Sequence, residues 1–127
     1  MLFRSIIQAG GQALVTAGDV RNAHVVNDIV AQVVDRWGKV DALVNAAGIP
    51  MAVPTTELSD DKWQMTLDIN VNGTFYFCRA VGPHMIKQGY GTIVNFGSLH
   101  SFQGIPMRTA YAASKGAVLQ QIGRAHV

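Results

Sequence analysis

The pattern of hydrophobic and polar positions predicts three short strands. Apolar runs of strand length occupy residues 12–17, 40–45 and 91–96, and glycines or polar residues typical of turns flank them. The segments between these runs have helical periodicity, and strands that alternate with helices form parallel sheets covered by helices on both faces. The chain is therefore predicted to have an α/β fold, in which ligands bind at the carboxyl ends of the strands.

Three segments carry the periodicity of a helix. Apolar residues recur on one face over residues 22–37, and Gly38 stands where a helix C-cap belongs. A second helix is predicted to begin after Ser59, an N-cap residue followed by aspartates that complement the helix dipole, and to end at Gly89. A third is predicted from Thr109. Because no internal repeat interrupts this pattern, it fits a single domain.

Composition narrows the class of protein. Hydrophobic residues make up 49% of the 127 residues and charged residues 14%, which is typical of a globular domain and argues against a disordered or nucleic-acid-binding chain. No apolar run approaches the roughly 18 residues of a membrane span, so a cytoplasmic protein without a membrane or nucleic-acid partner is expected. Cys78 is the only cysteine, so no internal disulfide is expected. His24, His84 and His100 are not spaced as metal ligands, so no metal site is expected either.

Both ends of the sequence are interpreted as adapter-encoded. Residues 122–127, IGRAHV, are the translation of a common sequencing-adapter oligonucleotide, and its reverse complement, read from a GTG start, encodes residues 1–5, MLFRS. Both segments are therefore left out of the fold prediction. Residues 6–121 remain as the central part of one domain.

Side chains able to bind and transfer a proton follow the third predicted strand. Tyr111 and Lys115 open the last predicted helix, and their i, i+4 spacing places both on one face. A free phenol loses its proton only near pH values of about 10, and an adjacent ammonium favours the phenolate, which makes such a tyrosine usable as an acid or base. Ser98, at the end of the strand, is placed to hydrogen-bond a carbonyl or hydroxyl oxygen.

Read together, five motifs resemble those of the short-chain dehydrogenase/reductase family, and of its 3-oxoacyl-carrier-protein reductases in particular. Ser98 lies thirteen residues before Tyr111, the usual interval in that family. The resemblance covers essentially all of residues 6–121. The motifs are DV at residues 19–20, NAAG at 45–48, INVNGTF at 69–75, GTIVNFGS at 91–98 and YAASK at 111–115.

The resemblance implies a role for each matching residue. Tyr111 would donate and accept the proton, Lys115 would assist it and hold the nicotinamide ribose, and Ser98 would orient the substrate oxygen. Asn70 would hold a water that links the lysine to solvent, the alternative being a mid-helix asparagine that faces solvent. The implied cofactor-binding residues are Asp19 and Val20 at the adenine ring, Asn45, Ala46 and Gly48 on the adenosine side, and Tyr111 and Lys115.

The implied activity is the NAD- or NADP-dependent interconversion of a small-molecule ketone and a secondary alcohol. The implied fold is a partial Rossmann-type doubly wound parallel sheet that holds strands 3, 4 and 5 and lacks the glycine-rich turn of the first part and the last part of the fold. The parent protein is expected to be a homodimer or homotetramer, and the 127-residue chain itself to be inactive. Two alternatives stay open: a non-catalytic Rossmann-like binding protein, and a sugar-nucleotide epimerase or dehydratase of the extended branch.

Overall fold

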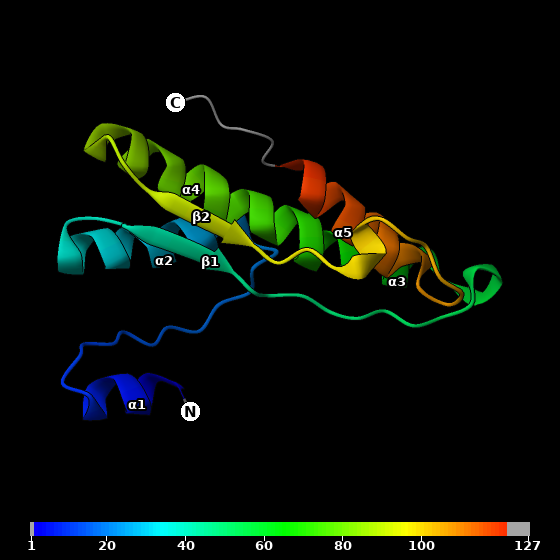
Figure 1. Ribbon diagram of the computed structural model, residues 1–127, viewed down its shortest axis with the longest axis horizontal. Coiled ribbons are helices and arrows are strands. Elements are labelled where there is room, and N and C mark those ends of the chain that lie inside the picture. Colours follow the sequence, from blue (N-terminus) through cyan, green and yellow to red (C-terminus); the bar gives the residue numbers. More distant parts are fainter. Residues whose placement is uncertain (1, 122–127) are drawn as a thin grey trace.

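The computed structural model of the chain describes residues 2–121 as alternating helices and strands (Figure 1). From residue 22 onward, this alternation confirms the predicted α/β fold. The elements are α1 (Leu2–Gln8), α2 (Ala23–Trp37), β1 (Ala42–Asn45), the 3₁₀ turn η1 (Thr55–Glu57), α3 (Asp60–Leu67), the π-helical turn η2 (Asp68–Asn72), α4 (Gly73–Gln88), β2 (Thr92–Asn95), the 3₁₀ turn η3 (Leu99–Ser101) and α5 (Thr109–Gln121).

Strands β1 and β2 form a parallel pair. Their register runs from Ala42 opposite Thr92 to Asn45 opposite Asn95. Parallel neighbours need a long crossover connection, and the helical segment α3–η2–α4 supplies it. The second and third predicted strands are thereby confirmed.

The hydrophobic core lies between this strand pair and helices α2 and α4. Val30 of α2 packs with Val81 and Met85 of α4, and Leu43 and Ile93 of the two strands lie against this cluster. Burial of these side chains removes apolar surface from water, which is the main favourable contribution to folding. The core therefore fixes how the crossover helix sits on the strands.

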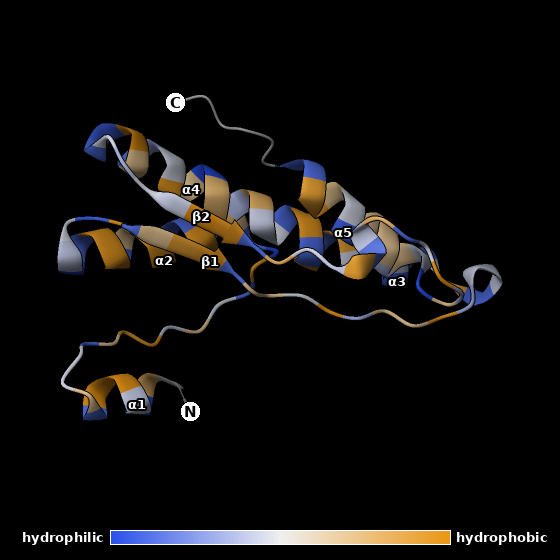
Figure 2. Ribbon diagram, in the orientation of Figure 1, coloured by the Kyte–Doolittle hydropathy of each residue, from blue (hydrophilic) through white to orange (hydrophobic). Residues whose placement is uncertain are grey.

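The opposite face of the strand pair is exposed. Val44 and Val94 are register partners and are 58% and 44% exposed, and Figure 2 shows both strands largely in the hydrophobic colour. The sequence predicts helices on both faces, whereas α2 and α4 pack on the face that carries Leu43 and Ile93. An apolar surface is therefore open to solvent in the part of the chain that the structure describes.

The first predicted strand does not form. Residues 12–17 adopt neither helix nor strand, and Leu14 and Val15 are 38% and 66% exposed. A strand is stabilised by hydrogen bonds to a neighbour, and across residues 2–121 the only strand pairing is that of β1 with β2. The prediction is wrong here because an apolar segment without a neighbouring strand forms no inter-strand hydrogen bonds.

Most helix boundaries follow local signals. The Asn22 side chain accepts two backbone N–H groups of the first turn of α2, and Gly38 ends that helix with φ 74°. Ser59 caps α3, and Gly89 ends α4 with φ 77°, a backbone conformation that favours glycine. The predicted ends at Gly38, Ser59 and Gly89 are confirmed, and the predicted second helix is interrupted by the π turn η2.

Helix α1 is not among the predicted elements. It crosses the predicted boundary between residues 5 and 6, and in Figure 1 it lies apart from the strand pair. The adapter origin of residues 1–5 stays a prediction. The second predicted adapter segment, residues 122–127, lies outside the described residues.

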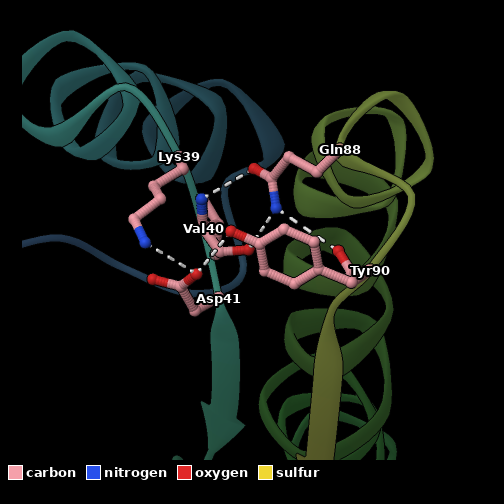
Figure 3. Close-up of polar contacts among 5 residues, drawn as sticks. All are labelled: Lys39, Val40, Asp41, Gln88 and Tyr90. Atoms are coloured by element: carbon pink, nitrogen blue, oxygen red, sulfur yellow. Dashed lines mark hydrogen bonds and ion pairs between the residues drawn. The ribbon is translucent and has the colours of Figure 1, made fainter.

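A side-chain amide closes the amino end of β1 (Figure 3). Gln88 Oε1 accepts the Val40 N–H at 2.9 Å, and Gln88 Nε2 donates to the Val40 carbonyl at 2.9 Å. Beside it, the Tyr90 hydroxyl donates to Asp41 at 2.8 Å and Lys39 pairs with the same carboxylate at 3.1 Å. These two donors, Tyr90 foremost, lower the pKa of Asp41. These hydrogen bonds fix the amino end of β1, and the candidate active-site residues lie at the opposite, carboxyl end of the strands.

Candidate active site

The two strands end in asparagines whose side chains are joined. Asn45 Nδ2 donates to Asn95 Oδ1 at 2.8 Å and to Cys78 Sγ of α4 at 3.4 Å. Burial raises the pKa of the Cys78 thiol, although the hydrogen bonds with both asparagines act in the opposite direction. The last residue of β1 is thus held to both β2 and α4, which fixes where the following loop begins.

The loop after β1 passes close to two predicted catalytic residues. A Cβ placed on Gly48 would lie 3.3 Å from Asn70 Oδ1 and 3.9 Å from Lys115 Nζ. Such a substituent would press on the amide oxygen and take up space beside the ammonium. The structure therefore brings Gly48, Asn70 and Lys115 together, although they are far apart in sequence.

Asn70 is buried in the π turn η2, with 1% of its surface exposed. Its Oδ1 accepts the Ile49 N–H at 2.8 Å, and its Nδ2 donates to the Ile49 carbonyl at 3.1 Å and to Ser114 Oγ at 2.9 Å. The alternative of a solvent-facing asparagine is wrong. Single π turns inside α-helices are frequent at functional sites, and this one places an amide between the loop after β1 and helix α5.

Lys115 is a buried cation, with 8% of its surface exposed. Its ammonium donates to the Phe96 carbonyl at 2.6 Å and lies 5.9 Å from the centroid of the Tyr111 ring. Among residues 2–121, no carboxylate pairs with it. A buried charge needs partners and an ammonium has three donors. The donors not used by Phe96 are therefore suited to ligand oxygens beside Tyr111.

Ser98 precedes η3 with its hydroxyl proton available. Its Oγ accepts the His100 backbone N–H at 3.2 Å, and within the described range it donates to no other residue. A serine hydroxyl both accepts and donates, so this proton is free for a ligand oxygen. The His100 ring packs edge-on against the Tyr111 ring, with centroids 5.9 Å apart. Turn η3 and helix α5 thus meet at the predicted proton donor.

A pocket of about 240 Å³ lies at the carboxyl end of β1. Three predicted cofactor-binding residues, Val20, Asn45 and Ala46, are among its lining residues, together with Gly73. A Cβ on Gly73 would lie 2.9 Å from Val20 Cγ2. Glycine at this position therefore lets Val20 approach α4 and form one wall of the pocket.

Asp19 is not among the residues that line this pocket. Its carboxylate accepts hydrogen bonds from Arg21 Nε at 3.0 Å and from the Arg21 terminal nitrogen Nη2 at 2.6 Å. These hydrogen bonds lower the pKa of Asp19 to about 2, and about half of each side chain is exposed. The predicted contact between Asp19 and an adenine ring stays a prediction.

Two serine hydroxyls that the sequence prediction missed tie α5 to its surroundings. Ser114 is fully buried, accepts from Asn70 and donates to the Tyr111 carbonyl at 2.8 Å. Ser101 donates to the Lys115 carbonyl at 2.8 Å. One signal was available for Ser101, because it follows Ser98 by three residues, the spacing of a capping box.

The chemistry of this site rests on hydroxyl, amide and ammonium groups. In the described part of the chain, no group of three or more His, Cys, Asp or Glu side chains is arranged to hold a metal ion. Across the same residues, no helix combines the length and the apolar character needed to cross a membrane.

Comparison with known proteins gives matches over most of the chain. The family described as "short chain dehydrogenase" matches residues 2–124. The short-chain reductase protein NovJ of Streptomyces niveus is 40% identical over 114 residues, which cover 90% of this chain and 43% of that protein. A 3-oxoacyl-[acyl-carrier-protein] reductase of Synechocystis sp. is 33% identical over 114 residues, which cover 90% of this chain and 46% of that protein.

Solved structures share the arrangement of elements. The crystal structure of an NAD⁺-bound xylitol dehydrogenase matches with a TM-score of 0.90 at 37% identity, over 94% of this chain and 46% of that one. This confirms the predicted partial Rossmann-type fold, with two of its three predicted strands formed in the described residues. The chain spans less than half the length of the relatives it matches.

Proposed function

The chain belongs to the short-chain dehydrogenase family, and on that basis we propose that the complete protein is an NAD(P)-dependent oxidoreductase that interconverts a ketone and a secondary alcohol. The observation that carries this proposal is the buried Lys115 ammonium, which has no carboxylate partner in the described residues and lies 5.9 Å from the Tyr111 ring. A cation in that position assists a phenol that loses and regains a proton.

The residues present fit a nicotinamide dinucleotide. Lys115 has free donors for ribose hydroxyls, and the absence of a side chain at Gly48 leaves room beside its ammonium. When bound, the cofactor supplies or accepts the hydride. We assign the pocket at the end of β1 to the adenosine of NAD or NADP. Val20, Asn45 and Ala46 line this pocket, and we also assign Asp19 and Gly48, which are not among its lining residues, to the adenosine.

In the reducing direction, the substrate carbonyl oxygen accepts hydrogen bonds from the Ser98 and Tyr111 hydroxyls. When the carbonyl is reduced, Tyr111 would transfer its phenolic proton to the oxygen, leaving a secondary alcohol and a phenolate. Lys115 stabilises that phenolate by its positive charge. Asn70 holds the water through which Lys115 exchanges a proton with solvent. Oxidation follows the same steps in reverse.

We propose that the protein binds a small carbonyl or alcohol substrate and has neither a nucleic acid nor a membrane as a partner. Both 3-oxoacyl-carrier substrates and sugars or polyols fit the proposal, since a relative is named a 3-oxoacyl-[acyl-carrier-protein] reductase and a solved structure a xylitol dehydrogenase. We place the complete protein in the cytoplasm as a homodimer or homotetramer. Light scattering of the purified protein tests this assembly.

The test is a steady-state assay of the complete protein with NADH and NADPH against ketones, 3-oxoacyl thioesters and sugars, and with NAD and NADP against the corresponding alcohols. The near-ultraviolet absorbance of reduced nicotinamide reports each turnover. Stoichiometric change of cofactor and substrate supports the proposal. Dinucleotide binding without turnover favours the non-catalytic alternative. In a parallel reaction with a sugar nucleotide, followed by product analysis, conversion without net cofactor change favours the epimerase or dehydratase.

A further inference from the structure

The Ser98 loop and helix α5 are separate elements that must keep a fixed spacing. In the proposed reaction, Ser98 of the loop and Tyr111 of the helix reach the same substrate oxygen. The segment that joins them in sequence, residues 102–107, is exposed along its whole length. Exposed loops move more than the elements they connect, so the spacing has to be set by direct contacts of α5 with η3 and with the segment before it, where Lys115 Nζ donates to the Phe96 carbonyl at 2.6 Å.

Ser101 makes a side-chain hydrogen bond across that gap. Its Oγ accepts the Ser98 N–H at 3.1 Å and donates to the Lys115 carbonyl at 2.8 Å. The Ser101 backbone N–H also donates to the Ser98 carbonyl at 3.0 Å. One half-buried hydroxyl therefore bonds the backbones of two residues of the proposed active site.

The bond to Lys115 goes beyond the capping of a short turn. Capping of η3 needs only the hydrogen bonds between Ser98 and Ser101, whereas the second bond reaches a residue fourteen positions later. The His100 and Tyr111 rings also join η3 to α5. Ring packing tolerates sliding more than a hydrogen bond does, because hydrogen bonds weaken steeply with distance and angle.

We propose that Ser101 is a positioning residue that sets the distance between the Ser98 hydroxyl and the Tyr111–Lys115 pair. The inference rests on the proposed function, since the spacing matters only if these groups act on one oxygen. Removal of the hydroxyl leaves the Ser98 N–H and the Lys115 carbonyl without this link and lets η3 shift against α5. A misplacement of about 1 Å in a catalytic arrangement costs about 100-fold in rate.

The experiment compares three variants of the complete protein with the wild type. Ser101→Ala removes the hydroxyl, and Ser101→Thr keeps it. Ser59→Ala is the matched control, because the Ser59 hydroxyl caps α3 and its hydrogen bond in the described part of the chain is to the Lys62 N–H, not to η3 or α5. For each protein, kcat and KM, the melting temperature and the hydrogen–deuterium exchange rate of the Ser98 amide are measured.

Four results together support the proposal. Ser101→Ala lowers kcat by about tenfold or more with little change in KM, Ser101→Thr restores most of the activity, and Ser59→Ala keeps the wild-type kcat. The Ser98 amide also exchanges faster in Ser101→Ala. A kcat for Ser101→Ala within about twofold of wild type, or an equal loss in Ser59→Ala, overturns it.

Failure of the proposed function gives a different result. If the wild-type protein transfers no hydride with any substrate, the oxidoreductase assignment fails while the exchange measurement still reports on Ser101. Unchanged protection of the Ser98 amide in a folded Ser101→Ala protein overturns the positioning role by itself. Faster exchange in the same protein supports the link between η3 and α5.

Discussion

The Asn70 side chain hydrogen-bonds both backbone polar groups of Ile49, with its Oδ1 2.8 Å from the N–H nitrogen and its Nδ2 3.1 Å from the carbonyl oxygen. The same amide donates to Ser114 of α5. A loop that leaves a strand usually presents these backbone groups to water, whereas here a buried residue satisfies them. The π turn that carries Asn70 therefore holds the loop after β1 in place.

Replacement of Asn70 is expected to destabilise the complete protein. Asn70→Ala leaves the Ile49 groups and the Ser114 hydroxyl without this partner, and each buried unsatisfied group costs about 1–3 kcal/mol. The free energy of unfolding should fall by about 2–4 kcal/mol, as measured by urea denaturation. Asn72→Ala, in the same turn but with a bond to the Asp68 side chain, is the control and should cost about 0.5 kcal/mol or less. Equal losses of unfolding free energy in the two variants would contradict the role of Asn70 in holding the loop after β1.

Tyr111 is expected to carry the proton. Tyr111→Phe keeps the ring and removes the hydroxyl, so the turnover rate should fall by at least about 100-fold while cofactor binding survives. Tyr90→Phe is the matched control, since Tyr90 lies at the other end of the strands, where its hydroxyl binds Asp41. Near wild-type turnover in Tyr111→Phe would exclude Tyr111 as the acid or base.

Lys115 is expected to serve both cofactor binding and turnover. Lys115→Met keeps most of the side-chain volume and removes the donors, so cofactor affinity should fall about tenfold or more, as expected for the loss of a hydrogen bond to a charged group. Fluorescence titration with NADH and NADPH measures the change. Lys87→Met, on the exposed surface of α4, should bind as the wild type does. Unchanged affinity and turnover in Lys115→Met would identify the lysine as structural only.

Cys78 is expected to react slowly near neutral pH. Burial raises the pKa of its thiol, so the pH midpoint of its alkylation by iodoacetamide should lie above the value of about 8.5 for a free thiol. The folded state then keeps its proton to a higher pH than the unfolded state, so stability declines as the pH rises above the free-thiol value. Asn45→Ala removes a hydrogen bond that lowers the pKa and should move the midpoint higher still. An alkylation midpoint at or below that of free cysteine would contradict the expectation that burial raises the pKa of Cys78.

The 127-residue polypeptide by itself is expected to associate and to bind dinucleotide weakly. Val44 and Val94 are exposed, and β1 has no partner other than β2 in the described residues. Free edges and apolar faces of strands favour association. Light scattering, circular dichroism and NADH titration of this polypeptide test the expectation. A monomer that melts cooperatively and binds cofactor at micromolar concentration would contradict it.

Features that depend on neighbours in sequence were the ones that could be predicted. The predicted caps Gly38 and Ser59 act within one turn of the helix they bound, and the spacing of Tyr111 and Lys115 is a property of one helix. The apolar run at residues 12–17 has the composition of a strand, but composition does not supply a pairing partner. That segment therefore stays outside the sheet.

Contacts between distant segments could not be read from the sequence. Asn70 meets Ile49 and Ser114 only because η2 lies against both the loop after β1 and helix α5. The bond from Ser101 to Lys115 likewise needs η3 to lie against α5. A serine or asparagine in a motif shows which hydrogen bonds are possible, but the partner depends on tertiary structure.

Two amide side chains hold β1 at both of its ends. Gln88 bonds both backbone groups of Val40 before the strand, and Asn70 bonds both backbone groups of Ile49 after it. The helical stretch between the two amides rises about 27 Å at about 1.5 Å per residue, and β1 with the loop that follows it lies between the two bonded residues. The length of the helical stretch therefore sets the distance between the two amides. An insertion or deletion of one residue between Asn70 and Gln88 would rotate one amide by about 100° away from the backbone groups that it binds.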